Sequence, residues 1–204
     1  MARRAAFEIV ASAGPNRVAS RRSGVPYPEA LRHLPRAVSV VTFERGADRL
    51  GVTATSLSSL SVDPPTILVS FDSAASISLA SATDASFGVS VLAASHAELA
   101  DHFGRGGLIE AAADDSEGSW VAAASGVILR SDALAAFECE SEEVIERHGR
   151  AIVIGRIRNV FKIGGSGALV YWRGAYNSIG WTDDEVRRAV GLFPVAPGGA
   201  GFPR

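Results

Sequence analysis

The chain has 204 residues, of which 47% are hydrophobic, and its 20 Lys and Arg side chains nearly balance 22 Asp and Glu side chains. A chain of this length buries one sizeable core, so we expect one domain with tails. Near-neutral charge and the lack of an apolar run of about 18 residues argue against nucleic acid and membrane partners. One cysteine, Cys139, and no Cys/His cluster favour a reducing cytoplasm and no metal.

The predicted elements begin after an Arg-rich segment, residues 1–27, which we interpret as a flexible tail. A short helix is expected over Pro28–Leu34, and β-branched runs predict a hairpin from residues 37–43 and 50–54. Pro64 and Pro65 exclude helix and lead into a strand over residues 66–71.

The second half of the domain continues this pattern. Its expected elements are strands at 87–92, 135–140, 151–160 and 167–172, short helices at 76–83 and 96–103, and a long loop at 104–124. Residues 181–204 end in LFPVAPGGAGFPR and are interpreted as a C-terminal extension or arm. Many short strands with few helices predict a mainly β domain over residues 28–180, closed as a barrel.

The segment Gly51–Pro65, GVTATSLSSLSVDPP, is the richest in chemistry. Its small hydroxyl side chains and backbone N–H groups suit the edge of a planar heteroaromatic ring or a phosphate. The alternative is a solvated Ser/Thr-rich turn.

This segment resembles the signature of the flavin reductase-like family, the small reductase components of two-component flavin-dependent monooxygenases. Further matching segments follow the family order: VSVVT at 38–42, TILVS at 66–70, FGVSVL at 87–92, ELADHF at 98–103, Trp120, FEC at 137–139, IVIG at 152–155 and LVYWRGAY at 169–176. The resemblance spans Pro28 to Ile179. It implies a Greek-key FMN-binding split β-barrel with a few short helices, usually a homodimer, with FMN or FAD near the subunit interface.

The resemblance also assigns candidate cofactor-binding residues. Thr53, Ala54, Thr55 and Ser56 match the loop that contacts the flavin ring. Those matching the ribityl and phosphate end are Ser70, Ser73 and Ser76. Phe103 and Arg105 match a segment that closes over the flavin, and Tyr176 matches a position near the nicotinamide.

Two positions depart from the family pattern. Many members carry Gly-Asp-His where this chain reads His148-Gly149-Arg150, so Arg150 replaces the histidine and His148 lies two residues away. We take both as catalytic candidates, with a surface arginine at a strand start as the alternative for Arg150. Ser73 stands where many relatives have a Lys or Arg for the flavin phosphate, a role that Arg105 could take over.

The implied activity is hydride transfer from NADH or NADPH to FMN or FAD, with the flavin supplying the redox chemistry. Diffusible reduced flavin would serve a partner monooxygenase or halogenase. Two alternatives stay open: an enzyme that retains its flavin and acts directly on an organic substrate, and a non-catalytic flavin-binding subunit.

Several other residues receive structural interpretations. We expect Cys139 to be a core thiol, Trp120 to anchor the long loop or cap the flavin groove, and His33 and His96 to be exposed helix residues. His102 could approach the ligand.

Overall fold

The computed structural model describes residues 27–45, 47–72, 85–109, 120–164 and 167–180. The predicted tails, apart from Tyr27, the predicted helix at 76–83 and the candidates Ser73 and Ser76 lie outside these ranges. The helical elements are α1 (Tyr27–Leu31), the 3₁₀ turn η1 (Ala94–His96) and α3 (Ala97–His102). The strands are β1 (Arg36–Ala37), β2 (Ser39–Arg45), β3 (Asp48–Ala54), β4 (Ser58–Val62), β5 (Pro65–Asp72), β6 (Ser86–Val91), β7 (Gly107–Leu108), β8 (Trp120–Ala122), β9 (Ile128–Arg130), β10 (Ala135–Arg147), β11 (Arg150–Ile163), β12 (Gly167–Trp172) and β13 (Ala175–Gly180).

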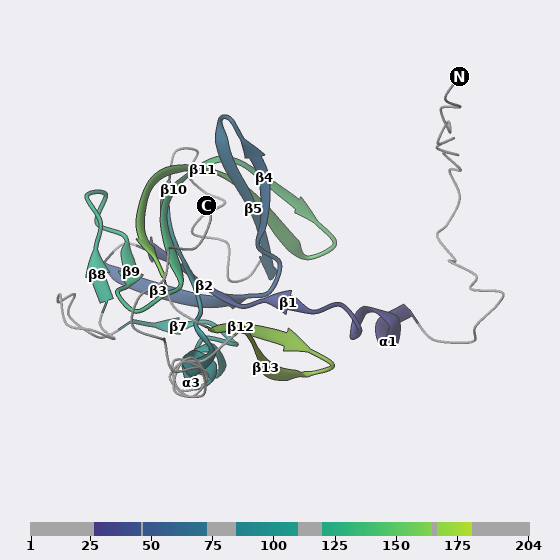
Figure 1. Cartoon of the computed structure of the whole chain (residues 1–204). Coiled ribbons are helices and arrows are strands. Elements are labelled where there is room, and N and C mark those ends of the chain that lie inside the picture. The colour runs from purple at the N-terminus through teal and green to yellow at the C-terminus, as the bar shows by residue number, and fades with distance from the viewer. Residues whose placement is uncertain (1–26, 46, 73–84, 110–119, 165–166, 181–204) are drawn as a thin grey trace, which may run out of the picture.

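The main sheet has eight strands in the order β4-β5-β11-β10-β6-β2-β3-β7, and it curls strongly on itself (Figure 1). The long strands β10 and β11 pair with three register shifts, and such bulges bend and twist a strand pair. Among the described residues no pairing joins the edge strands β4 and β7, so the barrel stays split. The predicted mainly β fold class is confirmed.

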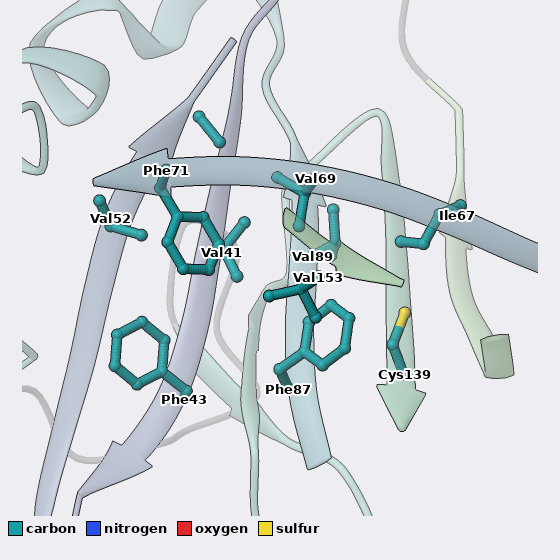
Figure 2. Packing of buried hydrophobic residues seen from close by; sticks show 11 residues of the cluster. Val41, Phe43, Val52, Ile67, Val69, Phe71, Phe87, Val89, Cys139 and Val153 are labelled. Atoms are coloured by element: carbon teal, nitrogen blue, oxygen red, sulfur yellow. The ribbon is translucent and has the colours of Figure 1, made fainter. Parts of the chain in front are cut away.

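Inside the curl lies an apolar core contributed by six strands, from β2 to β11 (Figure 2). Phe87 is fully buried there, and a Cβ on Gly155 would lie only 2.3 Å from its Cζ atom, so only glycine fits at that position. Cys139 is fully buried in the same cluster, and burial raises the pKa of its thiol to about 12. The prediction of a core thiol is confirmed.

A second apolar cluster lies on the opposite face of β2, beneath α3 and β12. It contains Val38 and Val40, whereas Val41 and Phe43 face the first core, so β2 is buried on both faces. This double burial explains why its sequence is almost continuously apolar. The three-stranded sheet β1-β12-β13 lies beside α3 at this end of the molecule (Figure 1).

The predicted elements that fall within the described residues are found with shifted, extended or shortened bounds, and several strands were missed. The strand β4, sequence SSLSV, has a low intrinsic strand propensity and is held by pairing with β5. The expected long loop contains β7 and β8, and β8 pairs with β9. Within the described ranges no helix is long and apolar enough to cross a membrane.

Candidate functional site

A cleft of about 560 Å³ opens where β3 and β5 end and β11 begins. Its lining includes seven of the residues predicted from sequence: Thr53, Ala54, Thr55, Ser56, Ser70, Arg105 and Arg150. The β5–β11 pairing, with Ser70 opposite Ile152, brings Arg150 beside the end of β5, where its Nη2 donates to the Ser70 carbonyl at 3.3 Å. Segments far apart in the sequence therefore meet at one cleft.

The cleft is electropositive. Arg36, Arg105 and Arg150 line it, and no Asp or Glu does within the described part of the chain. Guanidinium groups donate paired hydrogen bonds to phosphate oxygens, so this lining suits a phosphorylated ligand. The sequence reasoning missed Arg36, which carries no motif and reaches the cleft through the pairing of β1 with β12.

Two of the predicted ring-binding hydroxyls hold the wall of the cleft. Ser56 Oγ donates to the Ser70 carbonyl at 2.5 Å and accepts from the Ser70 N–H at 2.9 Å, which ties the loop to β5. Thr53 Oγ1 donates to the Ala100 carbonyl at 2.7 Å. With their protons committed, these hydroxyls can only accept from a ligand. Thr55 lines the cleft without a protein partner for its hydroxyl among the described residues.

Phe103 supports this wall from behind. Its side chain is 3% exposed and packs against Gly51, where a Cβ would lie 2.8 Å from the Phe103 Cδ1 atom. Its carbonyl accepts from the Thr53 N–H at 2.9 Å. The ring therefore lies in the core, while the neighbouring Gly104 and Arg105 line the cleft. Trp120, 5% exposed and edge-on to Phe103, anchors its segment.

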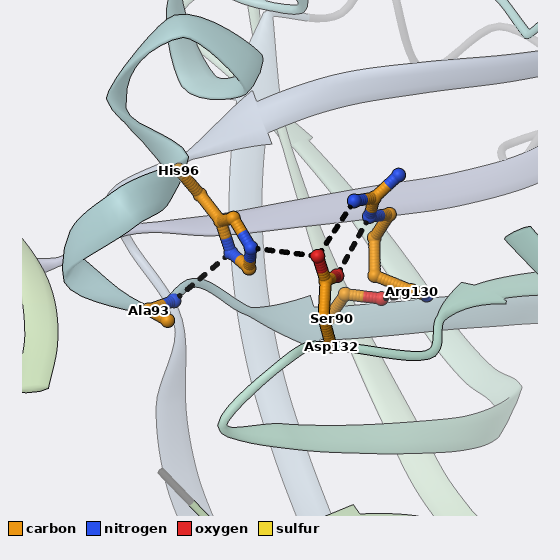
Figure 3. A network of polar contacts seen from close by, with 5 residues as sticks. All are labelled: Ser90, Ala93, His96, Arg130 and Asp132. Carbon is orange, nitrogen blue, oxygen red and sulfur yellow. Dashed lines mark hydrogen bonds and ion pairs between the residues drawn. The ribbon is translucent and has the colours of Figure 1, made fainter. Parts of the chain in front are cut away.

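A partly buried polar network fixes the 3₁₀ turn that leads into α3 (Figure 3). His96 Nδ1 accepts from the Ala93 N–H at 3.1 Å, so its proton lies on Nε2, which contacts Asp132 at 3.1 Å. Asp132 also takes two hydrogen bonds from Arg130, at 3.0 and 2.8 Å. The prediction of an exposed His96 was wrong: it is 8% exposed, and its ring contacts Asp132, which is distant in sequence.

The network is electrostatically balanced. Burial alone would raise the pKa of the Asp132 carboxyl, but the hydrogen bonds and charge interactions with Arg130 and His96 together outweigh it and hold that pKa below its ordinary value. Because α3 supplies the carbonyl that binds Thr53, this network indirectly positions the cleft wall.

A second cleft of about 540 Å³ adjoins the first and shares Thr53, Thr55 and Gly104 with it. Tyr176 lines this second cleft, edge-on to Tyr171 at 5.4 Å between ring centroids. Burial, and then the charge of Asp101, raise the pKa of Tyr176. Two adjoining spaces that share a wall can hold two ligands side by side.

The two catalytic candidates, His148 and Arg150, lie in different surroundings. His148 is exposed in the β10–β11 turn with a left-handed φ of 52°, and it lines neither cleft. Arg150 lines the first cleft. His102 is exposed beside Phe103, at 4.7 Å between rings, and also lines neither.

Comparison with known proteins gives consistent relatives. Residues 31–180 match the family model described as "Flavin reductase like domain". The chain is 30% identical over 157 residues to the FMN reductase (NADH) RutF of Bradyrhizobium diazoefficiens, covering 77% of this chain and 86% of that one.

Solved structures agree with this match. The NADH:FAD oxidoreductase SgcE6 of Streptomyces globisporus, solved with NAD and FAD fragments, is 26% identical with a TM-score of 0.62, covering 74% of this chain and 88% of that one. BorF, the flavin reductase component of a bacterial two-component tryptophan halogenase, is 29% identical with a TM-score of 0.61, covering 75% and 96%.

Proposed function

Because the chain belongs to the flavin reductase-like family, we propose that it is an NADH-dependent flavin reductase that reduces FMN or FAD. The observation that carries this proposal is the cleft itself, whose described lining places three arginines, and no carboxylate, beside the small-residue wall Thr53–Ser56. The small side chains of this wall leave room for the flat ring system of a flavin, and the arginines can donate hydrogen bonds to the flavin's phosphate. The flavin, when bound, supplies the hydride-accepting chemistry.

In this proposal, the residues of this chain bind and orient the flavin and exclude water from it. Backbone groups of the Thr53–Ser56 segment would contact the edge of the flavin ring, and the Ser56–Ser70 and Thr53–Ala100 hydrogen bonds hold this segment in place. Arg150 places a fixed positive charge at the cleft, which favours negative charge developing there during reduction. The adjoining cleft at Tyr176 would receive the nicotinamide, an assignment that its position beside the first cleft supports.

The experiment follows nicotinamide absorbance with purified protein, NADH or NADPH, and excess FMN or FAD. We expect NADH oxidation that depends on added flavin. Arg150→Ala should lower kcat/KM about tenfold, the loss expected for one charge-assisted contact of about 1.4 kcal/mol, while His148→Ala should change it less than about twofold. Inert NADH and NADPH with both flavins would refute the proposal.

We further propose that the product reaches a partner monooxygenase or halogenase by diffusion. The relatives named as components of two-component systems support this, and so does the open cleft. The test is done without oxygen, with the reductase and NADH on one side of a dialysis membrane. Reduced flavin should then appear on the other side. Flavin that stays bound through dialysis and turnover would instead identify an enzyme that keeps its cofactor.

A homodimer is also part of the proposal. Large apolar side chains are exposed on β4 and the far half of β11, namely Leu60, Val62, Val160 and Phe161, with Val62 88% exposed. Such side chains commonly mark an interface. Analytical ultracentrifugation should show a dimer that Val62→Glu weakens, whereas a wild-type monomer at micromolar concentration would contradict this part.

We place the protein in the reducing cytoplasm, an inference supported by its buried, free thiol at Cys139. Cell fractionation with an antibody against the chain tests this location, and recovery in a secreted fraction would contradict it.

A further inference from the structure

A third cleft, of about 370 Å³, lies between α1, β1 and the β12–β13 turn. Arg32, Arg36 and Arg173 line it, and among the residues that the structure describes no Asp or Glu does. It shares Arg36 with the first cleft, and it shares Tyr171 and Gly174 with the second. The three clefts are therefore contiguous, and the third extends the candidate site by a strongly basic end.

The backbone around this third cleft is cross-linked. The Arg173 N–H donates to the Arg32 carbonyl at 3.0 Å, and Trp172 Nε1 donates to the His33 carbonyl at 3.2 Å. The Arg173 guanidinium lies 4.5 Å from the centroid of the Trp172 ring. Among the described residues, no carboxylate forms an ion pair with Arg32, Arg36 or Arg173. The cations are thus positioned and left without an anion.

The turn that carries Arg173 breaks a local sequence preference. Trp172 pairs with Ala175, so Arg173 and Gly174 form a two-residue hairpin turn, with φ of 53° and 86°. Asn-Gly is favoured in such turns, since an arginine with a left-handed φ is sterically disfavoured. A Cβ at residue 174 would lie 2.7 Å from Arg32 Nη2, so Gly174 lets that guanidinium approach. Departures from local preference concentrate at functional positions.

We propose that this arginine cleft binds a phosphate group of a dinucleotide whose redox-active end occupies the neighbouring clefts. The proposal rests on the proposed function, since it places a further part of the same ligands. Arg36, shared by both clefts, lies where a diphosphate would pass from one to the other. The phosphate belongs either to the adenylate half of FAD or to the nicotinamide dinucleotide, and FMN has no group to reach it.

The test measures binding without turnover. Quenching of flavin fluorescence gives the dissociation constants of FMN and FAD, and titration calorimetry gives those of NAD⁺ and NADP⁺. Arg32→Gln and Arg173→Asn are made singly and together, so that a folding defect in one leaves the other informative. Arg158→Gln is the matched control, because Arg158 lies on β11 outside all three clefts and is ion-paired with Glu140.

The double variant should weaken at least one dinucleotide by roughly tenfold or more, while FMN affinity and the Arg158→Gln control change less than about twofold. Weaker FAD alone assigns the phosphate to the flavin, and weaker NAD⁺ or NADP⁺ alone assigns it to the nicotinamide. Unchanged affinities for all four ligands, or FMN weakened as much as FAD, would overturn the proposal. Since these are binding constants, a wild-type protein that fails to oxidise NADH would refute the proposed function separately.

Discussion

Two groups of charged side chains in this molecule are built in opposite ways. In the His96–Asp132–Arg130 network, the carboxylate is hydrogen-bonded by both of its neighbours. In the arginine cleft, Arg32, Arg36 and Arg173 share one lining, in which the described residues include no carboxylate. A satisfied network stabilises a fold, whereas convergent cations of like charge cost stability unless an anion arrives. The first group should therefore control folding, and the second should control binding.

The largest effect should come from Asp132→Ala. This change leaves Arg130 and His96 without their anion in a mostly buried environment, so we expect the free energy of unfolding to fall by about 2–3 kcal/mol. Chemical denaturation measures the loss. Glu140→Ala, which breaks the more exposed pair with Arg158, is the control and should cost less than about 1 kcal/mol. Equal losses in both variants would break the comparison.

Next in size is Arg105→Gln at the first cleft. Arg105 is exposed and forms no ion pair with the described residues, so its removal should weaken FMN binding by about tenfold through the lost phosphate contact. The unfolding midpoint should stay unchanged, because nothing in the fold depends on this charge. Fluorescence quenching and thermal unfolding on the same samples test both halves. A large loss of stability with unchanged affinity would reverse the roles assigned to the two groups.

The contrast between these two groups of charged side chains also explains which features could be predicted from the sequence. The strand pattern and the loop Thr53–Ser56 were predictable because contiguous residues carry their signal, in β-branched runs and a hydroxyl-rich turn. Arg105 and Arg150 came from resemblance and do line the cleft. The arginine cleft was not predictable, because Arg32, Arg36 and Arg173 come together only through the pairing of β1 with β12 and the hydrogen bond from the β12–β13 turn to the Arg32 carbonyl, just after α1.

His96 and Phe103 show the same limit of prediction from sequence, here at buried positions. The environment of His96 depends on Asp132, which no local periodicity links to it. Phe103 follows a helix in a family-like segment, yet its ring fills the space above Gly51. Burial is decided by residues distant in sequence, so short segments predicted the element and not the direction of the side chain.

A smaller effect, of opposite sign, is expected for Arg173→Asn. Asparagine tolerates the left-handed conformation of this turn position and removes one of three like charges, so stability should rise by about 0.5–1 kcal/mol. Thermal unfolding without ligand measures the gain. Trp172→Phe, which keeps the turn and removes the stacking surface under Arg173, is the companion variant and should bring no gain. A less stable Arg173→Asn protein would mean that the arginine serves the fold.

The smallest effect is the pH dependence of the Asp132 contribution. Because the pKa of this carboxyl is lower in the folded protein than in the unfolded chain, its stabilisation is complete above the unfolded value of about 3.9 and is lost as the pH falls through the lower, folded value. The stability difference between the wild type and Asp132→Asn should therefore be constant near pH 5 and narrow below about pH 4. Urea unfolding at closely spaced pH values measures that difference. Arg130 keeps its charge throughout this range. A stability difference that widened on acidification would therefore mean that the fold stabilises the protonated form of Asp132. That result would contradict the role of the ion-paired network in folding.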